Sequence, residues 1–277
     1  MTELSYMGAN LVAQQIQWNM TEGWMQGEDA ANAWYAPIET FGERFRAFVD
    51  LVADAGFTYL DVWTAQLHWR WATPEHLRLA QSALAARGLT VTSYAGLFGD
   101  TTEEFATACH VAASIGAPVL SGNTTLLSSD RRALIAALEW SGVQLGIENH
   151  PETAPDQVLA KIGTDGHGRI GAAIDTGWWG TQGYDAAEAI RALGPHVVHV
   201  DLKDVLAAGA HETCALGDGV VPIAACVQAL HDVGYRRPIT IEHEPEHFDP
   251  MDDVLLSRER VLVWLEKVSV GVPIGGE

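Results

Sequence analysis

Four side chains of the types that bind metal ions each stand near the end of a short apolar segment. They are Glu148, Asp175, His199 and Glu242, in the segments VQLGIEN (143–149), RIGAAIDTG (169–177), HVVHVDLKD (196–204) and PITIEHE (238–244). If these segments are parallel strands that close into a barrel, the four side chains meet at one mouth. Three carboxylates and one imidazole suit Mn²⁺, Mg²⁺ or Co²⁺ and also permit Zn²⁺. The sequence therefore predicts a divalent-metal site, with Mn²⁺ as the first expectation.

Three of these residues also have a structural explanation when each is considered alone. Asp175 opens Asp-Thr-Gly and could cap a turn. His199 stands between Val198 and Val200, as a hydrogen-bonded core histidine would. Glu242 could pair with a basic neighbour. The metal site rests on the combination, because four such side chains end four consecutive predicted strands.

Strand-like and helix-like patterns alternate eight times along the chain. The apolar or β-branched runs lie at 9–16, 57–63, 89–95, 117–121, 143–149, 169–175, 196–202 and 238–243. The helix-like patterns lie at 41–56, 73–88, 101–116, 128–141, 155–161, 184–193, 220–233 and 249–267. This alternation predicts a single (β/α)8 TIM barrel domain over residues 1–277, with residues 17–40 as a long first loop or lid. An open doubly wound sheet is the alternative, but the first strand is not followed by Gly-x-Gly-x-x-Gly.

The chain of 277 residues is strongly acidic, with 16 Lys and Arg against 36 Asp and Glu and a formal charge of −20. Such a charge disfavours binding to nucleic acid and to anionic membranes. The three cysteines predict free thiols in a reducing compartment. No apolar run approaches the roughly 18 residues of a membrane span, and the N-terminus does not resemble a signal peptide. We therefore expect a cytoplasmic protein.

Several short motifs resemble those of one enzyme superfamily. They are Gly-Ile-Glu-Asn-His (146–150), Ile-Asp-Thr-Gly (174–177), His-Val-Asp-Leu-Lys-Asp (199–204), Leu-Gly-Asp-Gly (216–219) and Ile-Glu-His-Glu (241–244). In type, order and spacing they resemble the sugar-phosphate isomerase/epimerase superfamily, the xylose-isomerase-like TIM barrels that include ketose 3-epimerases and inosose dehydratases. The resemblance covers nearly the whole chain. It implies that Glu148, Asp175, His199 and Glu242 are the metal tetrad and that Glu148 and Glu242 are the acid/base pair.

The ligand types indicate chemistry at a carbonyl carbon and its neighbour. A divalent ion chelated by a carbonyl and an adjacent hydroxyl stabilises an enediolate, and carboxylates on two faces can remove and return the proton. His150 is a second candidate base, or it donates a hydrogen bond to a ligand. Lys203 is a candidate for binding a substrate oxygen, with an ion pair to Asp201 or Asp204 as the structural alternative.

Aromatic residues and the scarcity of basic ones bear on the substrate. Trp18, Trp178 and His68 follow predicted strands and are candidate substrate-binding residues, with loop packing as the alternative for the tryptophans. Residues 205–235 contain no Lys or Arg, although the loops after strands 7 and 8 often bind phosphate in TIM barrels. An unphosphorylated sugar, cyclitol or glycoside is therefore expected.

Two reactions share this proton abstraction. The first is isomerisation or epimerisation of an unphosphorylated sugar or cyclitol. The second is β-elimination by a lyase from an oxidised (3-oxo) glycoside or an inosose, with a partner subunit as an option. A binding module without catalysis is a third reading, and a homo-oligomer stays open. The superfamily's endonuclease branch is disfavoured by the net charge of −20.

Overall fold

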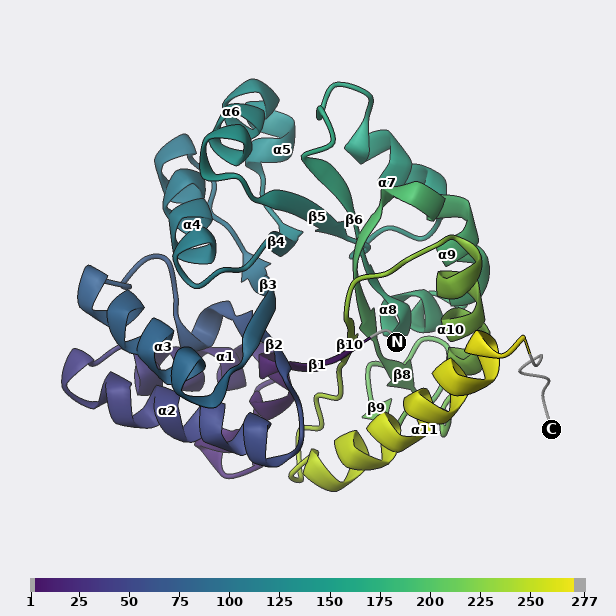
Figure 1. Cartoon of the computed structure of the whole chain (residues 1–277), viewed down its shortest axis with the longest axis horizontal. Helices are drawn as coiled ribbons and strands as arrows, with labels where there is room; N and C mark the ends of the chain where they lie inside the picture. The colour runs from purple at the N-terminus through teal and green to yellow at the C-terminus, as the bar shows by residue number, and fades with distance from the viewer. Residues whose placement is uncertain (1–2, 272–277) are drawn as a thin grey trace.

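Eight parallel strands close into a barrel in the computed structural model, which describes residues 3–271 (Figure 1). The order of strands around the barrel is β1-β10-β7-β6-β5-β4-β3-β2, and the ring closes where β1 pairs with β2. The barrel strands are β1 (Leu4–Met7), β2 (Tyr59–Trp63), β3 (Thr90–Leu97), β4 (Val119–Asn123), β5 (Gln144–Glu148), β6 (Ile170–Asp175), β7 (Val197–Leu202) and β10 (Ile239–Ile241). The closed ring confirms the predicted TIM barrel and excludes the open doubly wound sheet.

Helices surround the strands as an outer ring (Figure 1). The main helices are α2 (Ile38–Asp54), α3 (Pro74–Arg87), α4 (Thr102–Ser114), α6 (Arg131–Ser141), α7 (Pro155–Ile162), α9 (Ala186–Leu193), α10 (Ile223–Asp232) and α11 (Met251–Ser269). Each overlaps one of the eight predicted helices. Further elements are α1 (Trp24–Tyr35), α5 (Leu126–Ser129), α8 (Thr176–Thr181) and the antiparallel pair β8 (Asp204–Val205) and β9 (Thr213–Cys214).

Local signals set the ends of these helices. Thr73 and Thr101 cap α3 and α4, and each accepts a hydrogen bond from the backbone N–H three residues later. The helix α3 ends at Gly88, whose φ of 64° is left-handed, where glycine carries no steric penalty.

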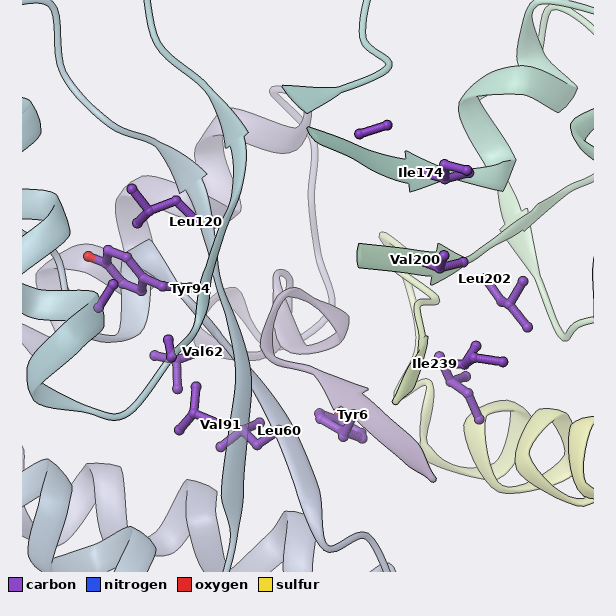
Figure 2. Close-up of a cluster of buried hydrophobic side chains, with 14 of the residues drawn as sticks. Tyr6, Leu60, Val62, Val91, Tyr94, Leu120, Ile174, Val200, Leu202 and Ile239 are labelled. Carbon is purple, nitrogen blue, oxygen red and sulfur yellow. The ribbon is translucent and has the colours of Figure 1, made fainter. Parts of the chain in front are cut away.

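The apolar core lies between the strands and the helices. On β7, Val200 and Leu202 alternate with the polar residues His199 and Asp201. Strand side chains alternate between two faces, so the apolar set turns toward the helices and the polar set toward the barrel axis. Figure 2 shows such outward apolar side chains on opposite sides of the barrel, and those labelled are Tyr6, Leu60, Val62, Val91, Tyr94, Leu120, Ile174, Val200, Leu202 and Ile239.

The first strand was predicted wrongly. The expected run at 9–16 forms 3-10 turns, and the strand is Leu4–Met7, which pairs with both Ile239–Ile241 and Tyr59–Asp61. Within the turns, the Asn10 side chain accepts a hydrogen bond from the His243 N–H and donates one to the Ile241 carbonyl. These turns lie beyond the end of β1, and most of their apolar residues are buried. The composition of this run therefore resembles that of a strand.

The predicted lid at 17–40 contains the helix α1 and the start of α2. Within residues 3–271, no helix is long and apolar enough to cross a membrane. The cysteines Cys109, Cys214 and Cys226 are free thiols.

Candidate functional site

Two polar layers are stacked inside the barrel, and β7 contributes to both. His199, Asp201 and the following Lys203 are two residues apart, so they point in the same direction. All three are buried. His199 and Asp201 belong to the deeper layer, and Lys203 belongs to the layer at the mouth.

In the deeper layer, the His199 imidazole lies between two carboxylates. Its Nε2 is 2.9 Å from Asp61 Oδ2 and 3.0 Å from Asp201 Oδ1. Asp61 also accepts hydrogen bonds from three hydroxyl groups, those of Ser5, Thr92 and Thr240. Asp61 is on β2 and His199 on β7, which are not neighbouring strands, so this contact crosses the barrel interior.

The two carboxylates keep the imidazole charged. Burial alone would lower the pKa of His199, but the negative charges of Asp201 and Asp61 raise it to about 10. Burial raises the pKa of Asp201 to about 6, although the charge of His199 acts in the opposite direction. At neutral pH the group is therefore a buried imidazolium that bridges two strands.

At the mouth, carboxylates from two strands surround the Lys203 ammonium. The Nζ atom is 2.7 Å from Glu244 Oε2, 3.2 Å from Glu242 Oε1 and 3.3 Å from Asp175 Oδ2. Burial would lower the pKa of Lys203, but the charges of Asp175, Glu242 and Glu244 raise it well above its ordinary value. Burial is also the largest cause of the raised pKa of Glu242.

Hydrogen bonds to the backbone of Asp175 and to its Oδ1 atom fix the position of this residue. The Asn149 amide donates to the Asp175 carbonyl at 2.9 Å and accepts from the Asp175 N–H at 2.8 Å. Asp175 Oδ1 accepts from the N–H groups of Gly177 and Trp178, which caps α8. The turn-capping alternative is therefore correct for one oxygen, and the other remains directed at the mouth.

Glu148 ends β5 beside this group. It is half-buried, and burial followed by the charge of Asp175 raises its pKa to about 8. A carboxyl group with a pKa near neutrality can both accept and donate a proton. Its strand pairing sets Glu148 beside Ala173, and Ala173 pairs in turn with His199.

The rim of the mouth carries stacked aromatic rings. His150 lies on Trp178 with ring centroids 3.7 Å apart and an interplanar angle of 11°, and His211 meets the edge of Trp178. Burial lowers the pKa of His150, which favours the neutral imidazole that a base requires. His68 follows β2, and burial lowers its pKa to about 4.

The helix α1 reaches the same mouth. The Trp24 indole Nε1 donates to Glu244 Oε1 at 3.2 Å, and the Trp24 ring meets the edge of Trp63 at 5.4 Å. Trp18 is partly buried and packs against the apolar core. The segment 17–40 therefore contacts Glu244, one of the carboxylates around Lys203, through Trp24. Trp18, from the same segment, packs against the core.

The loop after β7 is held by one buried carboxylate. Asp204 accepts hydrogen bonds from the backbone N–H groups of Val205, Gly217, Gly219 and Val221, at 2.9–3.0 Å. A Cβ atom at Gly219 would lie 2.3 Å from Asp204 Oδ1, so the loop needs glycine there. The Leu-Gly-Asp-Gly motif thus serves to fold this loop.

The mouth has the donor chemistry of a site for a hard cation. Asp175, Glu242 and Glu244 converge on one position, and divalent Mg²⁺ and Ca²⁺ prefer such oxygen donors. The Lys203 ammonium now holds this position, with oxygens at 2.7–3.3 Å, whereas Mg²⁺ and Ca²⁺ bind oxygen at about 2.0–2.6 Å. The residues therefore match a divalent ion in the type of donor, but their oxygens are not all within 4.8 Å of one another, so they would have to move closer together as the ammonium leaves.

The four predicted ligands are divided between the two layers. Asp175 and Glu242 meet around Lys203, Glu148 adjoins them, and His199 belongs to the deeper group. Among residues 3–271, one group of three metal-type side chains has ligand atoms all within 4.8 Å of one another, and it is Asp61, His199 and Asp201. The tetrad as a set of ligands to one ion stays a prediction.

Three residues of these layers were not predicted as site residues: Asp61, Asp201 and Glu244. The sequence carried a signal for two of them. Asp201 and Glu244 are each two residues beyond a predicted ligand, so strand alternation directs them to the same face. Asp61 lies within the predicted strand at 57–63, and nothing in the sequence distinguishes it from a solvated residue.

A comparison of the chain with protein-family models identifies a family of closed barrels. Residues 49–267 match the model for the xylose isomerase-like TIM barrel. The chain belongs to this family. The match covers most of the chain, so the predicted resemblance is confirmed. A search of curated proteins found no match.

Solved structures share the fold of this xylose isomerase-like barrel at low sequence identity. An L-ribulose 3-epimerase has a TM-score of 0.67 and 18% identity, with 100% of both chains covered. The IOLI protein with a bound zinc atom has a TM-score of 0.66 and 13% identity, with 97% of this chain and 99% of that one covered. A D-allulose 3-epimerase from Methylomonas sp., in complex with D-allulose, has a TM-score of 0.62 and 17% identity, with 95% and 97% covered.

Proposed function

We propose that this protein is a divalent-metal-dependent isomerase or epimerase that acts on an unphosphorylated sugar or cyclitol through an enediolate. The observation that carries the proposal is the convergence of Asp175, Glu242 and Glu244 on one cation position at the barrel mouth, with Glu148 beside it. The epimerases with a similar fold act on sugars according to their descriptions, which supports a sugar as the substrate class.

In this proposal Asp175, Glu242 and Glu148 would hold the metal ion, with Mn²⁺ as the first candidate. His199, the fourth predicted ligand, would bind it only after giving up the proton that it shares with Asp61 and Asp201. When bound, the ion would polarise the substrate carbonyl and stabilise negative charge on its oxygen. The zinc atom in the IOLI structure supports a divalent ion, but not manganese in particular.

Proton transfer falls to the protein's own carboxyl groups. The Glu148 carboxylate takes the proton from the carbon next to the carbonyl. Glu242 returns a proton from the other strand-end position. The stacked rings of His150 and Trp178 form an apolar wall against which a sugar ring can lie.

Incubation with a panel of ketoses and inososes in deuterated water tests the proposal. We expect Mn²⁺-loaded protein to exchange deuterium into the carbon beside the carbonyl and to form an isomer or epimer with the same carbon skeleton. Including 3-oxo-glycosides in the panel separates the lyase alternative, because elimination would release the aglycone. Absence of exchange and of release with every substrate would contradict both functions.

A further inference from the structure

The Lys203 ammonium is fully satisfied where it lies. An ammonium group has three donors, and Nζ has three carboxylate acceptors: Asp175, Glu242 and Glu244. The residue is buried, so no donor is left for a substrate oxygen in this arrangement. Lys203 thus acts as a counter-cation within the carboxylate group.

Two of its three partners are also predicted metal ligands. Nζ lies 3.3 Å from Asp175 Oδ2 and 3.2 Å from Glu242 Oε1, in the space between the two carboxylates. A dication that bound both of these oxygens at about 2 Å from between them would take the position of Nζ, and two positive charges cannot share that position.

We infer that Lys203 and a divalent cation are alternative occupants of one position at the barrel mouth, so that the ammonium leaves Asp175 and Glu242 before a metal ion binds. This inference rests on the metal dependence of the proposed function and adds a residue that sets the metal affinity. Lys203 stabilises the metal-free protein and weakens metal binding by the same contacts.

The lysine has a partner that allows this movement. Glu244 makes the shortest contact with Nζ, at 2.7 Å, and is not one of the predicted metal ligands. The Lys203 stem lies against Gly177, where an added Cβ atom would be 2.7 Å from Lys203 Cγ. The ammonium can therefore move toward Glu244 without losing every carboxylate, while the stem stays close to α8.

Calorimetric titration with Mn²⁺ tests the inference in the wild-type protein, Lys203→Met and the control Lys267→Met, which alters an exposed lysine on α11. We expect Lys203→Met to bind Mn²⁺ at least about tenfold more tightly than the wild-type protein, because the competing charge is gone. Lys267→Met should bind like the wild type. Thermal unfolding gives a second readout: Lys203→Met should unfold at a lower temperature in EDTA and recover when Mn²⁺ is added.

Equal Mn²⁺ affinity in Lys203→Met and wild type would overturn the inference, as would the absence of Mn²⁺ binding in both.

If Lys203→Met does not fold, Gly177→Ala replaces it. The added methyl group displaces the Lys203 stem, while the charge of Lys203 is retained, and we again expect tighter Mn²⁺ binding.

Nuclear magnetic resonance of ¹⁵N-lysine-labelled wild type gives a third readout. Saturation with Mg²⁺ should shift the Nζ signal of Lys203 and leave those of Lys161 and Lys267 unchanged. An unshifted Lys203 signal in Mg²⁺-saturated protein would overturn the inference. Failure of the proposed function is a separate result, namely Mn²⁺-loaded wild type that exchanges no substrate proton.

Discussion

At the scale of single residues, burial adjusts the carboxyl groups at the mouth for proton transfer. An exposed glutamate is fully ionised at neutral pH, so it is a weak base and a poor acid. Burial and the charge of Asp175 raise the pKa of Glu148 to about 8, and burial also raises the pKa of Glu242. The Glu148 carboxyl group can therefore exist in protonated and ionised forms under ordinary conditions.

Replacing either glutamate by glutamine tests this role. Glu148→Gln and Glu242→Gln should each lower kcat by about 10²–10⁴-fold, because an amide neither accepts nor donates the proton. Deuterium exchange into substrate measures the loss directly. Glu266→Gln, on the exposed face of α11, is the control and should leave the rate unchanged. A near-normal rate in either mutant would remove that glutamate from the acid/base pair.

Asn149 acts on the site through Asp175. Its amide forms two hydrogen bonds with the Asp175 backbone, and it is buried. Asn149→Ala leaves a buried N–H and a buried carbonyl without this partner, so we expect the free energy of unfolding to fall by about 2 kcal/mol. Urea denaturation measures this loss, with the exposed Gln157→Ala as the control. A loss no larger than that of Gln157→Ala would show that Asn149 does not fix Asp175.

At the scale of the elements, the loop after β7 depends on Asp204. Its carboxylate accepts four backbone N–H groups, including those of Gly217 and Gly219. Asp204→Ala leaves these donors unsatisfied, and we expect a loss of about 3 kcal/mol in unfolding free energy. Asp218→Ala, in the same loop, removes a half-exposed ion pair with Arg260 and should cost about 0–1 kcal/mol. Urea denaturation of both mutants separates a fold-supporting carboxylate from a surface one.

The elements also show what the sequence could predict. Seven of the eight strands were located because each is a short apolar run between helix-like patterns, as β7 is. The first was misplaced because residues 9–16 are apolar for a different reason, the packing of turns against Ala31 and Trp63. Asp175 ends β6 and Glu242 directly follows β10, so both lie at the strand ends that the sequence predicted. Their pairing with Lys203 was not predicted, because it depends on side-chain reach across the barrel, which strand periodicity does not encode.

At the scale of the whole molecule, stability and metal binding are separable. The apolar core between barrel and helices does not involve the mouth, and Lys203 gives the mouth carboxylates a cation when no metal is present. EDTA should therefore abolish turnover and leave the far-ultraviolet circular dichroism spectrum unchanged. Adding Mn²⁺ back should restore activity. Unfolding of the wild-type protein by EDTA alone would contradict this separation.

The charge of the whole chain should select against phosphorylated substrates. The formal charge is −20, residues 205–235 contain no Lys or Arg, and the buried Lys203 ammonium is already matched by three carboxylates. The carboxylates at this mouth would repel a phosphate dianion, and residues 205–235 offer no Lys or Arg to bind it. For a ketose that the enzyme accepts, we expect kcat/KM to be at least about 100-fold higher than for its phosphate ester, a difference of about 2.7 kcal/mol in transition-state stabilisation. Raising the ionic strength should narrow the gap, because salt screens the repulsion. A phosphate ester that reacts faster than the free sugar would mean that a cation outside residues 205–235 reaches the mouth.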